Sequence, residues 1–434
     1  MLRTVVSAVI LMTTLAAAEP AAPNTRQLTL REAVFSSAAN AGVRLSELSE
    51  VAARAGVRIE RASLLPQLNA VGSVSRGTRG VSSDPTDQPE AVGPYTNFDG
   101  RLHLGQALLD LSAWYRTDAA KQSSQAAMAQ GQVALEIAAE ASARGYAGLL
   151  RHRALVEVKR RDLALAEELA KLAEAQVQAG VAEPINATRA LTQVTIARGD
   201  LLIEENLVAQ AQIDLARALA LDSGTSFDAS SAFDSSLCVT AAPTDPNQAI
   251  GLALRDRPEL HAAAAARFAN RLTSDAIRGE RVGNAQLFAD AGRGGPAWSR
   301  TETTWTIGVQ YTVPIFDGLR REARIEAQDV QVRQDEISIT DLKDAITAEV
   351  RSALIDLASS QSLQAVAQER VALAEKELGQ ARDRFRVGVA SNLDVIAAQQ
   401  GLSRASEQSV NALAGAAGSR ARLARAVGQA TDLR

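Results

Sequence analysis

The chain has 434 residues, of which 46% are hydrophobic and 22% are charged. Its 46 Lys and Arg residues nearly balance its 50 Asp and Glu residues, so the net charge of −4 excludes a disordered tail and a nucleic-acid binder. The single cysteine, Cys238, excludes an intramolecular disulfide, a cysteine-rich metal site and, because it lies far from the N-terminus, a lipoprotein anchor. We expect it to be a buried thiol.

Residues 1–18 have the pattern of a secretory signal peptide. Arg3 supplies positive charge, Val5–Leu15 is an apolar run, and three alanines precede Glu19 as a cleavage site. An ordinary buried N-terminal helix is the alternative. The pattern predicts a mature chain outside the cytoplasm. After residue 18 no stretch of about 18 uncharged apolar residues follows, so a membrane span would have to be made of β-strands.

The chain repeats itself at a spacing of about 207 residues. Gln106–Asp110 in the first half corresponds to Val313–Asp317 in the second. Gln178–Ala182 corresponds in the same order to Arg386–Ala390. Chance matches rarely keep both order and spacing. We therefore expect two structural repeats of one plan, residues 19–240 and 241–434.

Each repeat is expected to hold three helices. The second of each set is free of proline and, as a single helix of about 70 residues, would be roughly 105 Å long, which is typical of a coiled coil or a duct rather than of a globular protein. The expected helices are 31–63, 108–179 and 184–221 in the first repeat and 245–281, 319–387 and 392–427 in the second.

The third helix of each repeat carries a heptad stripe of small residues, which lets neighbouring helices approach closely. In the first repeat Glu204 interrupts this stripe. The stripes comprise Ala190, Ala197, Ala211 and Ala218, and then Ala398, Ala405, Ala412, Ser419 and Ala426.

Between the first and second helices the hydrophobic period changes from helical to alternating. The clearest case is 304–313, where Trp305, Ile307 and every second residue to 313 face one side and polar residues face the other. We expect strand pairs at about 68–106 and 285–313, connected by turns at Asp84–Pro89 and Gly292–Pro296. A soluble hairpin with one face on a core is the alternative interpretation.

The aromatic residues favour a membrane. Nine of the fifteen, with every tryptophan among them, fall within residues 95–115 and 288–316, as interfacial girdles at strand ends require. The expected interface aromatics are Tyr95, Phe98, Trp298, Trp305 and Tyr311. Four strands cannot close a membrane barrel, so strands must be shared between chains, and a trimer would give about twelve.

These features together resemble the TolC-like outer-membrane efflux family across essentially the whole mature chain. The resemblance rests on the duplication, on Pro314–Gly318 before the second long helix, and on the segment Arg384–Val395. It implies a mainly α fold with a small membrane β-barrel: a long α-helical barrel and four amphipathic β-strands per protomer, internally duplicated and closed by trimerisation. It also implies that the turns at 179–184 and 387–392 form the periplasmic tip.

The resemblance assigns roles at that tip. It places a periplasmic gate at Asp394 and Phe385, and a surface that docks an adaptor at Gly180, Val181, Ala182, Val387, Gly388 and Val389. Asp394 aligns with an aspartate that helps form an acidic ring in relatives, and a solvated carboxylate at a helix N-terminus is the alternative. Ala390, Ala397 and Phe385 depart from the polar residues that some relatives carry, which puts the family's polar latch in doubt.

No enzyme motif accompanies these features. The three histidines, His103, His152 and His261, lie in unrelated contexts, and the chain has no HExxH, no GxSxG and no phosphate-binding glycine loop. We expect no catalysis, no cofactor and no metal.

The resemblance implies a homotrimer in the outer membrane of a Gram-negative bacterium, in contact with outer-membrane lipid and extending into the periplasm. Its implied partners are a periplasmic adaptor and an inner-membrane pump of the resistance-nodulation-division or ABC type, with no nucleic acid. The alternatives are a trimeric periplasmic or surface coiled-coil protein, or the outer-membrane duct of type I protein secretion. The sequence does not indicate the cargo.

Overall fold

The structure, a computed structural model, describes residues 25–81, 90–229, 233, 237–238, 241–387, 389 and 391–433. The expected signal peptide at 1–18, the connection Asp84–Pro89, and Gly388 and Ala390 in the second tip turn lie outside the described residues.

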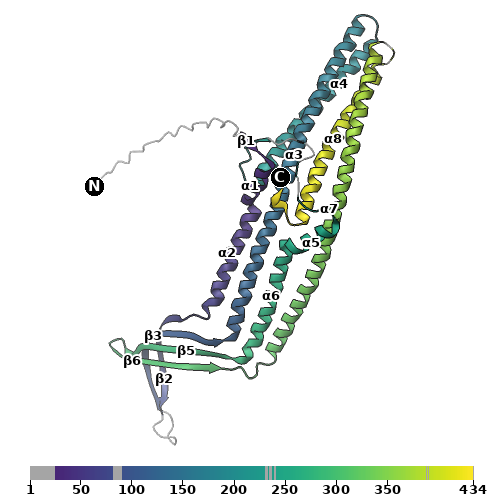
Figure 1. Cartoon of the computed structure of the whole chain (residues 1–434). Helices are drawn as coiled ribbons and strands as arrows, with labels where there is room; N and C mark the ends of the chain where they lie inside the picture. The colour runs from purple at the N-terminus through teal and green to yellow at the C-terminus, as the bar shows by residue number, and fades with distance from the viewer. Residues whose placement is uncertain are drawn as a thin grey trace, which may run out of the picture. The chain divides into compact units, whose positions relative to one another are not determined.

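The chain divides into two compact units, and each unit takes residues from both sequence repeats. Unit 1 comprises residues 1–33, 144–237 and 366–414, and unit 2 comprises 34–143, 238–365 and 415–434. The order of elements in the two halves is the same: a helix, two long strands, a long helix and a second long helix (Figure 1).

The longest elements are helices free of interior proline. Among the described residues no helix is both long and apolar enough to span a membrane. α3 (Leu111–Gln178) and α7 (Arg320–Arg386) have 68 and 67 residues, about 100 Å each, and each is followed by a helix of 35 residues, α4 (Pro184–Ala218) or α8 (Asn392–Ala426).

The first helical element of each half is broken, where the sequence predicted one helix. In place of 31–63 the structure has α1 (Leu30–Ser36), the 3-10 turn η1 (Ser37–Ala39) and α2 (Ala41–Ala62). The Asn40 side chain caps the new start by accepting a 2.9 Å hydrogen bond from the Gly42 N–H.

In place of 245–281 the structure has α5 (Pro246–Asp256) and α6 (Pro258–Gly279), followed by η2 (Glu280–Val282). Arg257 is extended because the residue before a proline disfavours helical geometry, and Pro258 then starts α6. A last 3-10 turn, η3 (Ala430–Asp432), follows α8.

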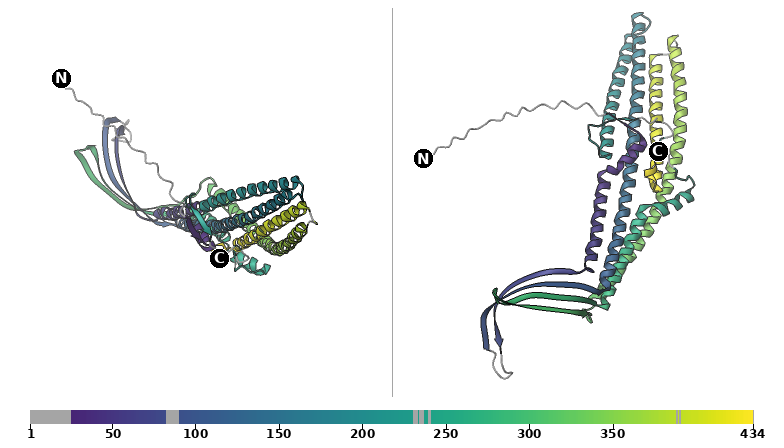
Figure 2. Two further views of the ribbon diagram at one scale, coloured as in Figure 1. Left: turned by 90° about the horizontal axis from the view of Figure 1, so that it is seen from above. Right: turned by 60° about the vertical axis from the view of Figure 1, so that its left-hand side comes forward.

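Unit 2 contains a four-stranded antiparallel sheet in the order β2-β3-β5-β6 (Figure 2). The strands are β2 (Gln67–Val81), β3 (Glu90–Asp110), β5 (Asn284–Ala297) and β6 (Arg300–Thr312).

The expected turn at Gly292–Pro296 is wrong, since these residues lie inside β5 and the chain reverses at Trp298–Ser299. Glycine is needed there for close backbone approach: a Cβ on Gly295 would lie 2.0 Å from the Arg300 carbonyl oxygen, and one on Gly292 would lie 2.4 Å from the Gly100 carbonyl oxygen.

Unit 1 contains a small parallel pair that the sequence did not predict, β1 (Thr25–Leu28) beside β4 (Ser226–Ala229). The buried Tyr146 hydroxyl on α3 donates a 3.0 Å hydrogen bond to the Leu28 carbonyl oxygen. The pair therefore ties two segments about 200 residues apart to the side of α3 within unit 1.

Each unit has its own apolar core. In unit 1 Leu169, Leu378, Phe385, Val395 and Ala398 form one buried cluster. Four alanines of the predicted stripes, Ala190, Ala197, Ala398 and Ala405, are also buried there. In unit 2 one cluster is built from α5, α6, α7 and α8 and includes Ile346, Val350 and Leu423.

Cys238 is the buried thiol that the sequence predicts, with no exposed surface. Burial raises its pKa to about 12, so the thiol stays protonated and unreactive at neutral pH.

Candidate functional site

The first helix reversal of unit 1 is made by glycine. Gly180 has φ of +71°, and the N–H of Val181 donates a 3.0 Å hydrogen bond to the Gln176 carbonyl oxygen, which satisfies the end of α3. Pro184 then starts α4 at the first helical position. This geometry leaves Val181 at 76% exposure.

The second reversal, between α7 and α8, lies at the same end of unit 1 (Figure 2). The Val389 N–H donates a 2.9 Å hydrogen bond to the Arg384 carbonyl oxygen, and Val387 and Val389 are exposed. The two reversals are linked, since the Asn392 side-chain amide donates a 3.1 Å hydrogen bond to the Asn186 carbonyl oxygen. The expected docking residues that the structure describes therefore form one end surface that carries exposed valines.

Asp394 lies in the first turn of α8 and forms a reciprocal cap with Ser391. Its Oδ2 accepts hydrogen bonds from the Ser391 backbone N–H (2.8 Å) and hydroxyl (2.9 Å), while its own N–H lies 3.3 Å from Ser391 Oγ. The Ser391 N–H and hydroxyl lower the pKa of this exposed carboxyl, with a smaller contribution from Arg384. The helix-capping alternative is thus realised, and the carboxylate remains solvent-exposed.

Phe385 does not lie on an open surface. It is 7% exposed and packs among Leu169, Leu378 and Val395 where α3, α7 and α8 meet. Its structural contribution is to hold these helices together just before the reversal.

A cluster of charged and polar side chains joins α3, α4 and α8 farther from the reversal. Lys159, only 15% exposed, lies against Glu407 and 3.5 Å from Asp200. Ser403 donates a 2.5 Å hydrogen bond to Asp162. We call Lys159, Asp162, Asp200, Ser403 and Glu407 the polar seam.

Burial governs the protonation of the polar seam. Desolvation raises the pKa of Asp162, although the Ser403 hydroxyl opposes that rise. Desolvation alone would lower the pKa of Lys159, but the hydrogen bond and charge of Glu407 more than compensate and raise it. One lysine thus faces three partly buried carboxylates, so its charge offsets only part of their mutual repulsion.

A second polar contact occupies the alanine stripe of α4. Glu204, which interrupts that stripe in the sequence, is 8% exposed, and its Oε1 lies 2.6 Å from Nδ1 of His152 on α3. Sequence reasoning missed both contacts. The interruption at Glu204 was the one signal that a charge would be buried in this interface.

The four-stranded sheet of unit 2 has two unlike faces. The register pairs Leu68 with Leu104, Leu102 with Ala291, and Ala291 with Trp305, so these side chains share one face. We call this the apolar face. Its apolar and glycine members include Leu68, Ala70, Gly72, Val74, Phe98, Gly100, Leu102, Leu104, Leu287, Ala289, Ala291, Trp305, Ile307, Val309 and Tyr311, and the same face also carries Gln106, Arg293 and Thr303.

The opposite face is mostly polar, with Val71, Phe288 and the predicted interface aromatic Tyr95 as its large apolar or aromatic members. Asp99 binds Arg101 at 2.7 Å, and His103 Nδ1 lies 2.8 Å from Asp290 on the neighbouring strand. The expected alternation is therefore present across all four strands. Large apolar side chains such as Trp305 and Ile307 are 74% and 62% exposed among the residues that the structure describes.

The predicted interface aromatics lie at different heights along the strands. Tyr95, Phe98 and Trp298 lie toward the hairpin end, where the Phe98 and Trp298 rings meet edge to face with centroids 5.9 Å apart. Tyr311 lies at the helical end, and its hydroxyl donates a 2.5 Å hydrogen bond to the Val282 carbonyl oxygen. Trp305 lies between them.

Among the described residues, no three His, Cys, Asp or Glu side chains gather so that they could hold a metal ion.

Comparison with known proteins decides the family. A family model described as outer membrane efflux protein matches residues 37–221 and 249–429, most of both halves. The chain belongs to the outer membrane efflux protein family. It is a TolC-like efflux channel protein of the outer membrane that extends into the periplasm.

Individual relatives and solved structures agree with this family assignment. The antibiotic efflux pump outer membrane protein ArpC of Pseudomonas putida is 26% identical over 385 residues, which is 85% of this chain and 76% of ArpC. A crystal structure of CusC has a TM-score of 0.80 at 18% identity and covers 93% of both chains. The CmeC channel of Campylobacter jejuni has a TM-score of 0.80 at 17% identity, over 92% of this chain and 86% of CmeC.

The two crystal structures show that the fold is shared. The family and ArpC are efflux channels, which are not enzymes, and they favour neither the coiled-coil stalk nor the secretion duct that the sequence left open.

Proposed function

We propose that three copies of this efflux channel protein assemble into one duct, with the sheets of unit 2 closing a twelve-stranded barrel in the outer membrane. The observation that carries the proposal is the apolar face, a surface continuous across four strands that no described residue of the protomer covers. A face of this size in contact with water would be costly, whereas lipid is its natural solvent.

The strand order supports closure between copies. β2 and β6 are the edge strands of the sheet, and edge strands in lipid must find partners. Because all neighbours are antiparallel, β2 and β6 run in opposite directions, so β6 of one copy can pair antiparallel with β2 of the next. Three sheets joined in this way give an even number of strands, as in bacterial outer-membrane barrels.

The height of the apolar face fits a bilayer. From Gly295, opposite Phe98, to Ala285, opposite Tyr311, β5 advances about 33 Å at about 3.3 Å per residue. At the tilt of about 40° usual for such barrels, this gives a band of about 25 Å.

The long helices carry further surface for contact between copies. On α4 Leu202 and Ile203 are each 62% exposed, and on α7 Val366 and Leu373 are each 61% exposed and seven residues apart. A seven-residue spacing of exposed apolar residues is what helix packing against another helix requires. These side chains support an α-helical barrel formed by the trimer.

The duct conducts passively and has no catalytic role or cofactor. Its cargo is delivered by an inner-membrane pump of the resistance-nodulation-division or ABC type through a periplasmic adaptor, and the pump supplies the energy. The name of ArpC, an antibiotic efflux protein, supports small organic molecules as cargo.

The adaptor docks on the end surface of unit 1, which includes Gly180, Val181, Ala182, Val387 and Val389. Gly388, the remaining predicted docking residue, lies outside the described residues. Exposed valines at both reversals favour an apolar contact with a partner helix. On trimer assembly three exposed Asp394 carboxylates form a ring that attracts cations at the gate.

Mass measurement and single-channel recording test the proposal together. Protein in mild detergent should have the mass of three chains, and in planar bilayers it should form pores that divalent cations block from the periplasmic side. Asp394→Ala should keep the pores and lose the block. A monomer, or a trimer that makes no pores, would refute the duct, and an unchanged block would remove Asp394 from the gate.

A further inference from the structure

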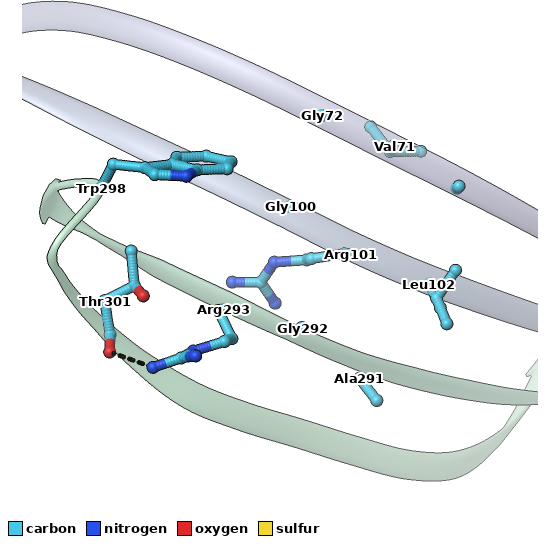
Figure 3. Close-up of a pocket in the computed structure, with 11 residues that line it drawn as sticks. Val71, Gly72, Gly100, Arg101, Leu102, Ala291, Gly292, Arg293, Trp298 and Thr301 are labelled. Carbon is cyan, nitrogen blue, oxygen red and sulfur yellow. Dashed lines mark hydrogen bonds between the residues drawn. The ribbon is translucent and has the colours of Figure 1, made fainter.

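The apolar face contains a hollow of about 590 Å³ in the half of the sheet nearer the hairpin turns. Much of its lining has little or no side chain, at Ala70, Gly72, Gly100, Ala291 and Gly292, and Leu102 and Trp298 stand at its two ends (Figure 3). Val71 and Arg101, which alternate with these residues along β2 and β3, also line it. Small residues in register on neighbouring strands thus leave a depression where a smooth lipid-facing wall would be expected.

Arg293 places a positive charge on the rim of this hollow. It pairs with Gly100 and with Thr303, two residues before Trp305, and so belongs to the apolar face. A guanidinium on a lipid-facing surface costs about 2–4 kcal/mol at the middle of a bilayer and much less near the headgroups. Its position near the hairpin turn therefore fits headgroup level.

Most N–H donors of the Arg293 guanidinium make no described hydrogen bond. Its one described hydrogen bond is a 3.3 Å contact from Nη2 to the Thr301 carbonyl oxygen (Figure 3). Among the side chains that the structure describes, no carboxylate lies within 4 Å of it. Arg101, which also lines the hollow, differs because its Nε donates to both carboxylate oxygens of Asp99, at 2.7 and 2.9 Å. An arginine has five N–H donors in a fork that suits phosphate.

Trp298 is the aromatic residue at one end of the hollow. Trp298 is 76% exposed, its ring meets the Phe98 ring edge to face, and it lines the hollow together with Arg293 and Thr301 (Figure 3). Tryptophan prefers the boundary between headgroups and acyl chains. The hairpin turns mark the outer leaflet, because the opposite ends of all four strands continue into the helices of a protein that extends into the periplasm.

We propose that this hollow binds one phosphorylated lipid of the outer leaflet, a lipopolysaccharide, with a phosphate on Arg293 and the start of an acyl chain on the glycine and alanine floor. The inference rests on the proposed function in one respect, that the apolar face contacts lipid. The apolar floor distinguishes a lipid from free phosphate, and the guanidinium distinguishes a phosphorylated lipid from a neutral one.

Native mass spectrometry of the trimer released from outer membranes in mild detergent tests the site. Wild type should retain lipopolysaccharide, and Arg293→Gln should weaken that retention by about tenfold or more, the factor expected for losing a charged hydrogen bond. The matched control is Arg300→Gln, which removes the same charge at the same hairpin but from the opposite face, since Arg300 alternates with Thr301. Equal losses in both variants would overturn the site in favour of general attraction.

The source of the phosphate is tested in nanodiscs. Trimers in phosphatidylcholine discs are titrated with lipopolysaccharide, with dephosphorylated lipopolysaccharide or with inorganic phosphate, and the fluorescence of Trp298 is taken as the difference from Trp298→Phe. A saturable change with intact lipopolysaccharide alone is expected. A response to inorganic phosphate of equal strength would make this an anion site, and an equal response to the dephosphorylated lipid would remove the role of Arg293.

Conductance of the same samples separates this inference from the proposed function. Arg293→Gln should conduct as wild type does, which shows that it is folded and inserted. A wild-type trimer that conducts but retains no lipid would overturn the lipid site and leave the duct intact. A protein that neither conducts nor assembles into trimers would overturn both.

Discussion

Nδ1 of His152 on α3 lies 2.6 Å from Oε1 of Glu204 on α4, inside a stripe that is otherwise alanine. Both side chains are mostly buried, at 16% and 11% exposure, so each depends on the other for its hydrogen bond. Removing one partner of such a pair leaves a buried polar group unsatisfied, while removing both is much less costly.

We therefore predict that Glu204→Ala lowers the stability of unit 1 by about 1–3 kcal/mol, although it restores the alanine of the heptad. The double variant Glu204→Ala with His152→Leu should recover part of that loss. Thermal melting of the detergent-solubilised protein, followed by circular dichroism, measures both. Strictly additive losses would mean that the two side chains do not interact.

This pair shows what the sequence reveals and what it hides. The proline-free runs and the repeat predict α3 and α7 within about three residues at each end, because helix length and end signals are local properties. The partner of Glu204 is 52 residues away on another helix, and only the packed structure decides that His152, rather than a neighbour, faces it.

The sheet also has features that the sequence reveals and features that it hides. Alternation and aromatic residues predict four strands, yet Gly292–Pro296 indicates a turn because glycine and proline usually mark one. Here the glycines are required by the close approach of Gly292 to Gly100 across strands, which sequence spacing does not encode. The β1 and β4 pair was missed because strands of four residues carry too little periodicity to detect.

Lys159 is the single cation of the polar seam, facing Asp162 on its own helix, Asp200 on α4 and Glu407 on α8. Lys159→Met should destabilise unit 1 by about 1–3 kcal/mol at pH 7, because partly buried carboxylates lose their counter-ion. Thermal melting should show a smaller loss near pH 5, since burial raises the pKa of Asp162 and protonation relieves the repulsion.

Lys171→Met is the control for that prediction. Lys171 is exposed on the same helix and within the same unit, so its loss should change stability by no more than about 0.5 kcal/mol. A pH-independent loss in Lys159→Met would indicate that packing of the lysine stem, rather than its charge, stabilises the interface.

Asp394 should keep its charge in acid. Its pKa is lowered by the Ser391 N–H and hydroxyl, so the folded state favours the carboxylate. The contribution of this carboxylate to the free energy of unfolding is complete above the ordinary aspartate pKa of about 3.9. It is lost as the pH falls through the lower pKa that Asp394 has in the folded protein. In planar bilayers we expect the block by divalent cations to persist between pH 7 and about pH 5. Loss of the block within that range would show that repulsion within the ring outweighs the cap.

Gly180 should resist substitution because of its backbone geometry. Its φ is +71°, and no atom would lie within 4 Å of a Cβ added there, so an added methyl group meets strain rather than a clash. Gly180→Ala should cost about 1–2 kcal/mol, and Gly180→Asn should cost less. Gly148→Ala on α3 is the control, also in open space but in a helix, and should stabilise by up to about 1 kcal/mol. Equal effects on melting temperature would contradict the positive-φ argument.

Ile307 and Thr306 are neighbours on β6 that face opposite sides of the sheet, Ile307 on the apolar face and Thr306 opposite Asp290 on the polar face. Ile307→Lys should cost about 2–4 kcal/mol in the membrane, because a lysine near the middle of the lipid-facing band is desolvated. Thr306→Lys adds the same side chain one residue away but directs it toward the water-filled interior. We expect trimers in the outer-membrane fraction to fall sharply for Ile307→Lys and to stay near wild type for Thr306→Lys. The reverse order would mean that the apolar face packs on protein and the polar face meets solvent outside, and the assignment of the two faces would have to be exchanged.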